Sequence, residues 1–266
     1  MEAFLVDVFT TAAGHGNPAA VVLTDGLSAA EMGGIAARLR RETTFVTGTT
    51  LRFYQPSGAA MTLCGHGTLA ALAVMGRQGR FEISVPAGDL HVNVAQTMLG
   101  MAMPPASLGE PMDGAPAAEA LGIDVSDIDG PVQVAGVGRP KLIVPLASLS
   151  VLDGLHPDQA AVEEFCATVG VTGLYPFTRK ARNPVTVADA RHFCAGAGIH
   201  EDPVTGVAAV ALAWYLWRHG VIPGCVPVKV SQGHAMGRPG LAMVRQEEDG
   251  QTWIYGQAVI GGTSQL

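Results

Sequence analysis

The sequence predicts an α+β protein built from two similar halves. Glycine (34 residues) and proline (17 residues) are frequent along the 266 residues, which is typical of many short strands joined by turns rather than of a helical bundle. Two Ala-rich apolar segments, at 62–75 and 201–216, each follow directly on a polar turn. Strands and helices recur in a similar order around both segments. The pattern therefore predicts a duplicated unit with one apolar helix in each half.

The first half is predicted to hold several strands, one amphipathic helix and the first Ala-rich helix. Ser28 is suited to an N-cap, Glu31 follows three positions later, and basic residues end the segment, which predicts a helix over 28–41 despite Gly33 and Gly34. Runs of β-branched and apolar residues predict strands at 4–9, 20–23, 42–47, 51–54, 81–85 and 90–95.

The second half is predicted to repeat this order after a change in composition. Residues 104–131 are rich in Pro, Gly and acidic residues, which is typical of a connection between domains. We place the boundary near 112–130, with 1–115 as the N-terminal half and 116–266 as the C-terminal half, whose last strand can pack back on the first. Helices are predicted at 116–121, 157–169 and 201–216, and strands at 132–135, 141–145, 173–177, 185–188, 191–194, 227–231, 241–245, 252–255 and 257–260.

Composition excludes several functional classes. The formal net charge of −7, without a basic cluster, argues against a nucleic-acid partner. The N-terminus lacks a basic region, and the apolar runs are shorter than the ~18 residues that a membrane span needs, so a cytoplasmic protein is expected. The cysteines have no CxxC spacing, so we predict neither a metal site nor a disulfide framework. They are Cys64, Cys166, Cys194 and Cys225.

The two polar turns place helix N-termini where an anion can bind. Such a terminus has unpaired N–H groups and about half a positive charge. If the halves are equivalent, the two termini would hold a small carboxylate-bearing substrate from both sides of a cleft between the domains. Two ordinary capped core helices explain the same pattern equally well.

Cys64 and His66 are the reactive residues of the first turn. A thiol before a helix N-terminus favours its thiolate form. Aligning Gly67 with Gly206 places Pro203 opposite Cys64, which disfavours a racemase with two thiols and predicts a buried, inert Cys64. His66 is then a hydrogen-bond donor or proton relay, or a residue that stabilises the turn.

Two acidic residues have competing interpretations. Asp202 either caps its helix or faces the cleft and binds an amine or hydroxyl group. Glu42 either points inward, where desolvation raises the pKa of a carboxyl and suits it to general acid/base catalysis, or pairs with Arg38 or Arg41 at the surface. The residues alone favour the surface pair.

Five ordered motifs resemble those of phenazine-biosynthesis PhzF-like proteins, and the resemblance extends over essentially the whole chain. The motifs are GNPAAVVL (16–23), RETTFV (41–46), LCGHGTLAA (63–71), RHFCAGAGIHEDPVTG (191–206) and SQGHAMGRPG (231–240). The resemblance implies the diaminopimelate epimerase-like fold: two similar domains, each with a β-sheet curled around a central helix, and an active site in the cleft between them. It also implies a homodimer.

The resemblance further implies cofactor-free isomerisation, in which proton transfer moves the double bonds of a small carboxylate-bearing cyclic or unsaturated amino acid in secondary metabolism. It implies Glu42 as the general acid/base, with His66 and Asp202 orienting the substrate and relaying protons. Substrate binding is assigned to Asn17, Gly65, Gly67, Thr205, Gly206 and Val207.

Two departures from the family pattern make the predicted pocket less polar. Val207 stands where the family usually has serine, and residues 58–63 lack an acid that commonly precedes the Gly-His pair. We therefore expect a substrate other than dihydro-hydroxyanthranilate. An amino-acid epimerase is an alternative, which the lack of a second thiol disfavours. A non-catalytic binding protein is another, which the joint presence of Glu42, His66 and Asp202 disfavours.

Overall fold

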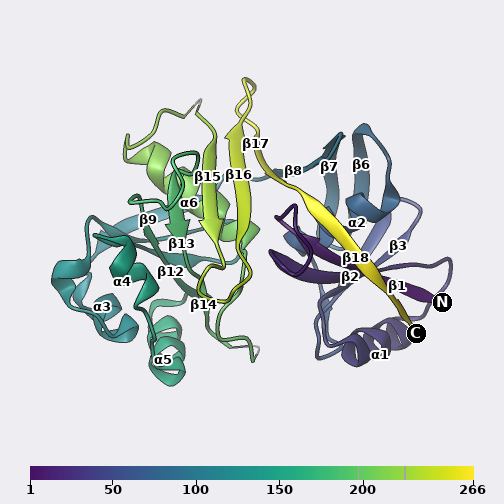
Figure 1. Ribbon diagram of the computed structural model, residues 1–266, viewed down its shortest axis with the longest axis horizontal. Helices are drawn as coiled ribbons and strands as arrows, with labels where there is room; N and C mark the ends of the chain where they lie inside the picture. Colours follow the sequence, from purple (N-terminus) through teal and green to yellow (C-terminus); the bar gives the residue numbers. More distant parts are fainter. Residues whose placement is uncertain (197, 225) are drawn as a thin grey trace. The chain divides into compact units, whose positions relative to one another are not determined.

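The computed structural model describes residues 1–196, 198–224 and 226–266, so Cys225 lies outside the described residues. The chain forms two compact units, each with strands and helices, and this confirms the predicted α+β class (Figure 1). Unit 1 consists of Met1–Ala102 and Trp253–Leu266, and unit 2 consists of Met103–Thr252.

Strand pairing decides which unit each end of the chain joins. β9 (Ser107–Met112) pairs with β10 (Val132–Gly136) in unit 2, so unit 1 ends before residue 115, the limit expected from the sequence. The last strand, β18 (Ala258–Gln265), pairs antiparallel with β1 (Glu2–Val8) in unit 1. β17 (Thr252–Gly256) carries the chain back to unit 1.

The sheet of unit 1 runs in the order β18–β1–β2–β3–β4–β6–β7–β8. The β2–β3 and β4–β6 pairs are parallel, and the other pairs are antiparallel. The short β5 lies beside β4. The further strands are β2 (Asn17–Leu23), β3 (Thr43–Thr47), β4 (Thr50–Tyr54), β5 (Ala60–Met61), β6 (Gly79–Val85), β7 (Gly88–Ala95) and β8 (Met98–Met103).

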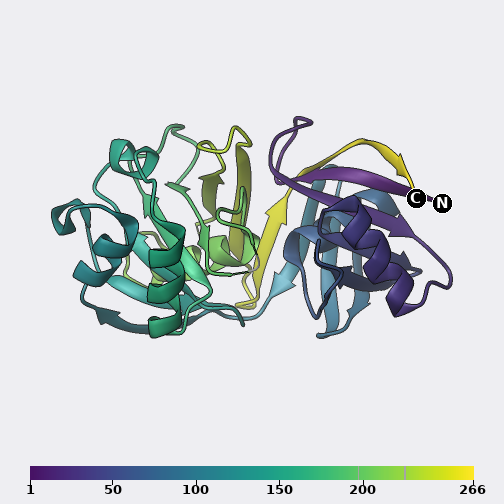
Figure 2. The ribbon, with the colours of Figure 1, turned by 90° about the horizontal axis from the view of Figure 1, so that it is seen from below.

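Two helices cover opposite faces of this sheet, which is why β3 is buried on both sides. Phe45 packs in a cluster with residues of α1 (Ala29–Leu39), whereas the neighbouring Thr44 faces Gly67 of α2 (Gly65–Met75). α2 packs against β1, β2, β3, β4 and β18. Figures 1 and 2 show α1 outside these strands and α2 enclosed by them. The small side chains of α2 allow strands to surround it closely.

The paired glycines of α1 provide a matched test of this packing. A Cβ on Gly33 would lie 2.8 Å from the carbonyl oxygen of Gly58, whereas a Cβ on Gly34 would meet nothing within 4 Å. Alanine is better than glycine inside a helix, so Gly34→Ala is expected to raise the free energy of unfolding by roughly 0.5–1 kcal/mol. Gly33→Ala is expected to lower it, because the backbone at Gly58 must move. Urea denaturation measures both changes, and equal stabilisation by the two variants would contradict the close approach.

Unit 2 repeats the pairing scheme of unit 1. Its strands run β9–β10–β11–β12–β13–β15–β16, with β11–β12 and β13–β15 parallel and the other pairs antiparallel. β14 lies beside β12. This alternation follows that of β18 to β7, in agreement with the predicted duplication. The further strands are β11 (Lys141–Pro145), β12 (Gly173–Thr178), β13 (Ala188–Ala190), β14 (Phe193–Cys194), β15 (Val228–Gln232) and β16 (Gly240–Gln246).

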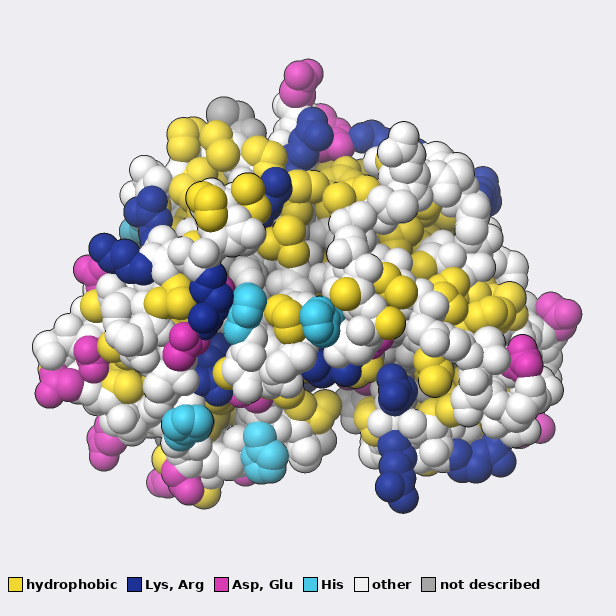
Figure 3. All heavy atoms as spheres, viewed as in Figure 1, with side chains coloured by type: hydrophobic (Ala, Val, Ile, Leu, Met, Phe, Trp, Pro, Cys, Tyr) yellow, Lys and Arg dark blue, Asp and Glu magenta, His cyan; other side chains and the backbone are white. Residues whose placement is uncertain are grey.

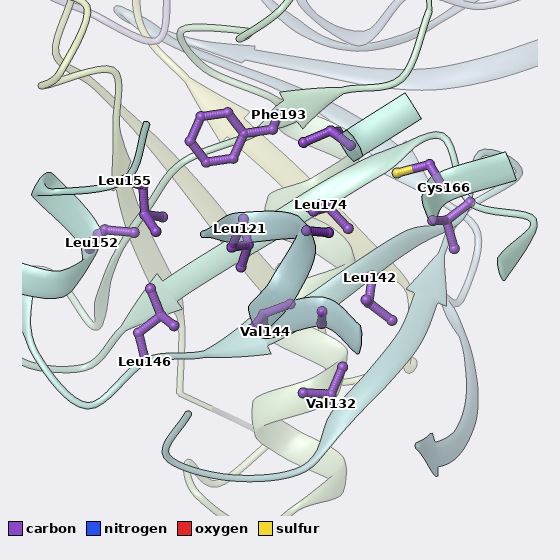
Figure 4. Packing of buried hydrophobic residues seen from close by; sticks show 14 residues of the cluster. Leu121, Val132, Leu142, Val144, Leu146, Leu152, Leu155, Cys166, Leu174 and Phe193 are labelled. Atoms are coloured by element: carbon purple, nitrogen blue, oxygen red, sulfur yellow. The ribbon is translucent and has the colours of Figure 1, made fainter. Parts of the chain in front are cut away.

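The helices of unit 2 again divide between the two faces of the sheet. α6 (Gly206–Arg218) packs against β9, β10, β11 and β16, as α2 packs in unit 1. The other face carries an apolar cluster in which Leu121, Leu142, Cys166 and Leu174 meet (Figure 4). This cluster joins the sheet to α3 (Ala115–Leu121), α4 (Leu149–Asp153) and α5 (Gln159–Val169), and the 3-10 helix η1 (Val125–Asp127) follows α3.

Several element boundaries differ from the sequence predictions. β8, β9 and α4 were not predicted, since their short segments lack clear periodicity. α1 ends at Leu39 rather than at 41, because Arg40 adopts a left-handed conformation with φ 52°. α6 begins at Gly206, after the acidic turn that was predicted to open it.

The helix caps also correct the alignment of the two halves. Cys64 is the N-cap of α2, and its carbonyl accepts from the N–H of Thr68. Thr205 is the N-cap of α6, and its carbonyl accepts from Ala209. Thr205, and not Pro203, therefore occupies the position of Cys64. The conclusion that a second thiol is missing there stands, because threonine carries a hydroxyl.

On the face that Figure 3 draws, Lys and Arg side chains lie at several separate places, with one small group at the lower right. Acidic and basic side chains are interspersed there with neutral surface. Within the described part of the chain, no helix is long and apolar enough to cross a membrane.

Candidate active site

Unit 1 brings Glu42, Cys64 and His66 together at the N-terminus of α2. Glu42 directly precedes β3, which packs against α2, and Cys64 and His66 lie at the cap and in the first turn of that helix. Gly67 makes this packing possible, because a Cβ there would lie 2.6 Å from the hydroxyl oxygen of Thr44 and 3.0 Å from the Cys64 sulfur. The local sequence therefore brings a carboxylate, a thiol and an imidazole to one place.

The carboxylate of Glu42 is the centre of this cluster. The Cys64 thiol donates to Glu42 Oε2 over 3.0 Å, and the same sulfur accepts from the N–H of Gly67 over 3.3 Å. His66 Nε2 lies 3.1 Å from Glu42 Oε2 without a hydrogen-bonding alignment, and Nδ1 lies 3.7 Å from the Cys64 sulfur. The Glu42 side chain remains 24% exposed and that of His66 14%. Glu42 thus points toward these two residues, and the surface pair with Arg38 or Arg41 that the residues alone favoured is not formed.

Unit 2 gathers a second polar cluster at the N-terminus of α6. The Thr205 hydroxyl donates to Asp202 Oδ2, and His192 Nδ1 lies 2.8 Å from the same hydroxyl oxygen. Gln232 Nε2 donates to the Asp202 carbonyl over 2.6 Å, and Tyr175 donates to Gln232 Oε1 over 2.9 Å. Asp202 is therefore bonded to the N-cap residue and is not itself the cap. These hydrogen bonds to its carboxylate and its carbonyl fix the turn that contains Asp202.

The protonation of His192 follows from these contacts. His192 is buried, and burial is the main cause that lowers its pKa, so the ring is neutral. Because the Thr205 hydroxyl gives its proton to Asp202, its oxygen must accept from Nδ1–H of His192. The cluster is thus a directed chain of hydrogen bonds from His192 through Thr205 to the Asp202 carboxylate. The neighbouring Lys141 is also buried, and desolvation lowers its pKa to about 8.

Removing the middle hydroxyl tests this chain. Thr205→Val keeps the shape of the side chain but leaves His192 Nδ1 and one Asp202 oxygen without that partner. We expect it to lower the free energy of unfolding by about 1–3 kcal/mol, since unpaired buried polar groups carry their full desolvation cost. Thr205→Ser retains the hydroxyl and should recover most of this loss in urea denaturation. A valine variant as stable as the serine variant would contradict the chain.

The predicted site residues divide between the two units. Glu42, His66, Gly65 and Gly67 lie together in unit 1, where Asn17 is buried at the start of β2. The rest lie together in unit 2: Asp202, Thr205, Gly206 and Val207. Gly206 and Val207 form the first turn of α6, and Val207 is partly buried.

Sequence reasoning did not single out His192 or Gln232. Both belong to the family motifs at 191–206 and 231–240, yet nothing in their spacing predicts that they meet at Asp202. The thiol contact of Cys64 with Glu42 was also missed, since 22 positions separate the two residues. Motif membership was the only available signal for all three.

Comparison with known sequences gives matches over almost the whole chain. The family model of phenazine biosynthesis-like proteins (PhzC-PhzF) matches residues 6–263. The uncharacterized isomerase YddE of Escherichia coli (strain K12) is 31% identical, over 97% of this chain and 96% of the relative. The trans-2,3-dihydro-3-hydroxyanthranilate isomerase of Pseudomonas chlororaphis is 30% identical, over 91% of this chain and 89% of the relative.

Solved structures show the same similarity. The phenazine biosynthesis protein of the PhzF family from Bacillus anthracis superposes with a TM-score of 0.89 at 26% identity, covering 100% of this chain and 98% of the other. A hydroxyproline epimerase from Agrobacterium vitis has a TM-score of 0.64 at 11% identity, covering 100% and 90%. The epimerase shares the fold alone.

Proposed function

Since the chain belongs to the phenazine biosynthesis-like PhzC-PhzF family and is an isomerase of that family, we propose that it moves a carbon-bound proton within a small carboxylate-bearing substrate, with Glu42 as general acid/base. The observation that carries this proposal is the position of the Glu42 carboxylate, which a thiol hydrogen bond holds in place while its side chain stays 24% exposed. A base needs both a fixed position and access to substrate.

The proposed reaction needs no redox change. The Glu42 carboxylate takes a proton from one substrate carbon, the electron pair of that C–H bond moves into the conjugated system, and the double bonds shift. Protonated Glu42 then returns the proton to another carbon. One C–H bond breaks and one forms, so the substrate and product are isomers and no cofactor is consumed.

The groups around Glu42 support this cycle. The Cys64 thiol donates to the Glu42 oxygen that lies 3.1 Å from His66 Nε2, so this hydrogen bond can stabilise the negative charge when the proton is absent. The N-terminus of α2 adds a favourable field for a substrate carboxylate. For Asp202 we propose substrate orientation, with its carboxylate fixed by Thr205.

The substrate is proposed to be a small cyclic or unsaturated amino acid other than trans-2,3-dihydro-3-hydroxyanthranilate. Val207 in the first turn of α6 supports this proposal, because it offers methyl groups where the family pattern has a hydroxyl. An apolar position favours less polar groups, though by less than a site built to bind a hydroxyl rejects a partner that lacks one.

Hydrogen exchange in D2O tests the proposed function. The protein is incubated with a panel of dihydroaromatic and other unsaturated amino acids, and 1H NMR follows each C–H signal. Deuterium incorporation with double-bond migration is the expected result. Exchange at one α-carbon with inversion would instead identify an epimerase, and absence of exchange across the panel would favour a binding protein.

A further inference from the structure

The Glu42–Cys64–His66 cluster also has the composition of a metal site. The three residues offer an oxygen, a sulfur and a nitrogen ligand, and one ligand atom from each lies within 4.8 Å of the other two. His66 Nε2 is buried and has no hydrogen-bond partner. Sequence spacing predicted no metal site, because the ligands come from separate segments rather than from a CxxC pair.

We propose that Glu42, Cys64 and His66 bind Zn²⁺, and that the bound metal inhibits the enzyme. Zn²⁺ accepts mixed sulfur, nitrogen and oxygen ligands in a tetrahedral arrangement. Thiolate and imidazole ligands select it over Mg²⁺ or Ca²⁺, which prefer oxygen alone. The inhibitory half of the inference rests on the proposed function, because the metal occupies the carboxylate that would transfer the proton.

The distances need little adjustment to accept the ion. Zinc bonds of about 2.3 Å to sulfur and about 2.0–2.2 Å to nitrogen or oxygen place tetrahedral ligand atoms roughly 3.3–3.6 Å apart. The Cys64 sulfur and Glu42 Oε2 are 3.0 Å apart. His66 Nε2 lies 3.1 Å from that oxygen, and His66 Nδ1 lies 3.7 Å from the sulfur. These contacts involve different nitrogens, Nε2 and Nδ1, so zinc binding requires the ring to turn until one nitrogen faces both other ligands.

The surroundings of the three ligands fit reversible metal binding. The exposed part of Glu42 leaves an approach from solvent and a fourth position for water. The charge of the ion balances that of one carboxylate and one thiolate, so the site is neutral when filled. With three protein ligands and one open position, the arrangement is that of accessible zinc sites rather than closed structural ones.

Direct metal binding by the full-length protein tests the site without any need for turnover. Calorimetric titration with Zn²⁺ is expected to give one bound ion, and Co²⁺ is expected to give a thiolate-to-cobalt absorption band. Changes outside the ligand set alone typically weaken metal binding by 10–100-fold, so Cys64→Ser is expected to weaken it by more than about 100-fold and to abolish the band. His66→Gln should also weaken binding, and circular dichroism of both variants separates loss of a ligand from a folding defect.

Cys194→Ser is the matched control. Cys194 is a partly exposed thiol 3.6 Å from His192 Nδ1, so it tests the rival thiol–imidazole pair of unit 2. This variant should retain both the stoichiometry and the cobalt band. Loss of the band in Cys194→Ser, unchanged binding in Cys64→Ser, or no binding by the wild-type protein would each overturn the site.

The inhibitory effect has its own measurement. With a substrate that exchanges in D2O, added Zn²⁺ is expected to slow exchange at the concentrations that fill the site, and a chelator should restore the rate. Exchange that continues at full zinc occupancy would overturn inhibition while leaving the site in place. If no substrate exchanges at all, the proposed function fails, and the titration still decides whether the metal site exists.

Discussion

Glu42→Gln is expected to lower the rate of substrate proton exchange by about 10²- to 10⁴-fold, the usual contribution of a positioned general acid/base. The amide has nearly the shape of the carboxylate but cannot take up a proton at the pH of the assay. The side chain is partly exposed, so the variant should fold, and circular dichroism with urea denaturation verifies this. D2O exchange followed by NMR then measures the rate on the same substrate as for the wild type.

Glu82→Gln is the control for this variant. Glu82 lies on β6 in the same unit, its side chain is 54% exposed, and it contacts the still more exposed surface residue His91. Its substitution should leave exchange unchanged. A wild-type exchange rate in Glu42→Gln would contradict the proposed mechanism, even though the chain belongs to the family.

Arg191→Met is expected to lower the free energy of unfolding by about 3–5 kcal/mol, the cost of leaving a buried charge without its partner. The guanidinium of Arg191 donates to both carboxylate oxygens of Glu201, over 2.9 Å and 2.8 Å. It also donates to the carbonyls of Leu152 and Leu155. The arginine side chain is 7% exposed and the glutamate 15%, so little water can replace these bonds.

Two further variants isolate the buried pair. Arg191→Met combined with Glu201→Gln removes the orphaned charge and should recover part of the loss in urea denaturation. Asp153→Asn breaks a more exposed pair with Arg182, whose guanidinium keeps its contact with Asp189, and should cost about 1 kcal/mol or less. A similar loss in Arg191→Met and Asp153→Asn would show that the buried pair has no special role. Glu201 directly precedes Asp202, so a loosened turn should also reduce turnover in Arg191→Met.

Local sequence signals predicted the secondary structure where the residues of one segment are enough to favour a helix or strand there. The Ser28–Glu31 capping box starts α1 as predicted, with both reciprocal hydrogen bonds formed. The Ala-rich segments became the two helices that the sheets enclose, since small side chains permit close packing on all sides. The family resemblance, which rests on the order of five motifs, is confirmed by the comparisons.

Long-range pairing was outside the reach of those signals. β9 joins unit 2 through its pairing with β10, whereas β8, which directly precedes it, pairs with β7 in unit 1. Sequence periodicity describes one element at a time and contains no information about which strand lies beside it. The alignment of Gly67 with Gly206 was also wrong, because the N-caps Cys64 and Thr205, and not the glycines, mark where α2 and α6 begin.

The sequence by itself determined the fold class, the duplicated order of elements, the family and the candidate residues Glu42, His66 and Asp202. Only the tertiary structure decided what those residues touch. Packing of β3 on α2 brings Glu42 to a thiol 22 positions away, and the turn before α6 joins Asp202 to Thr205, within reach of His192. A carboxylate becomes a base, a capping partner or a metal ligand according to its neighbours, and folding alone supplies those neighbours.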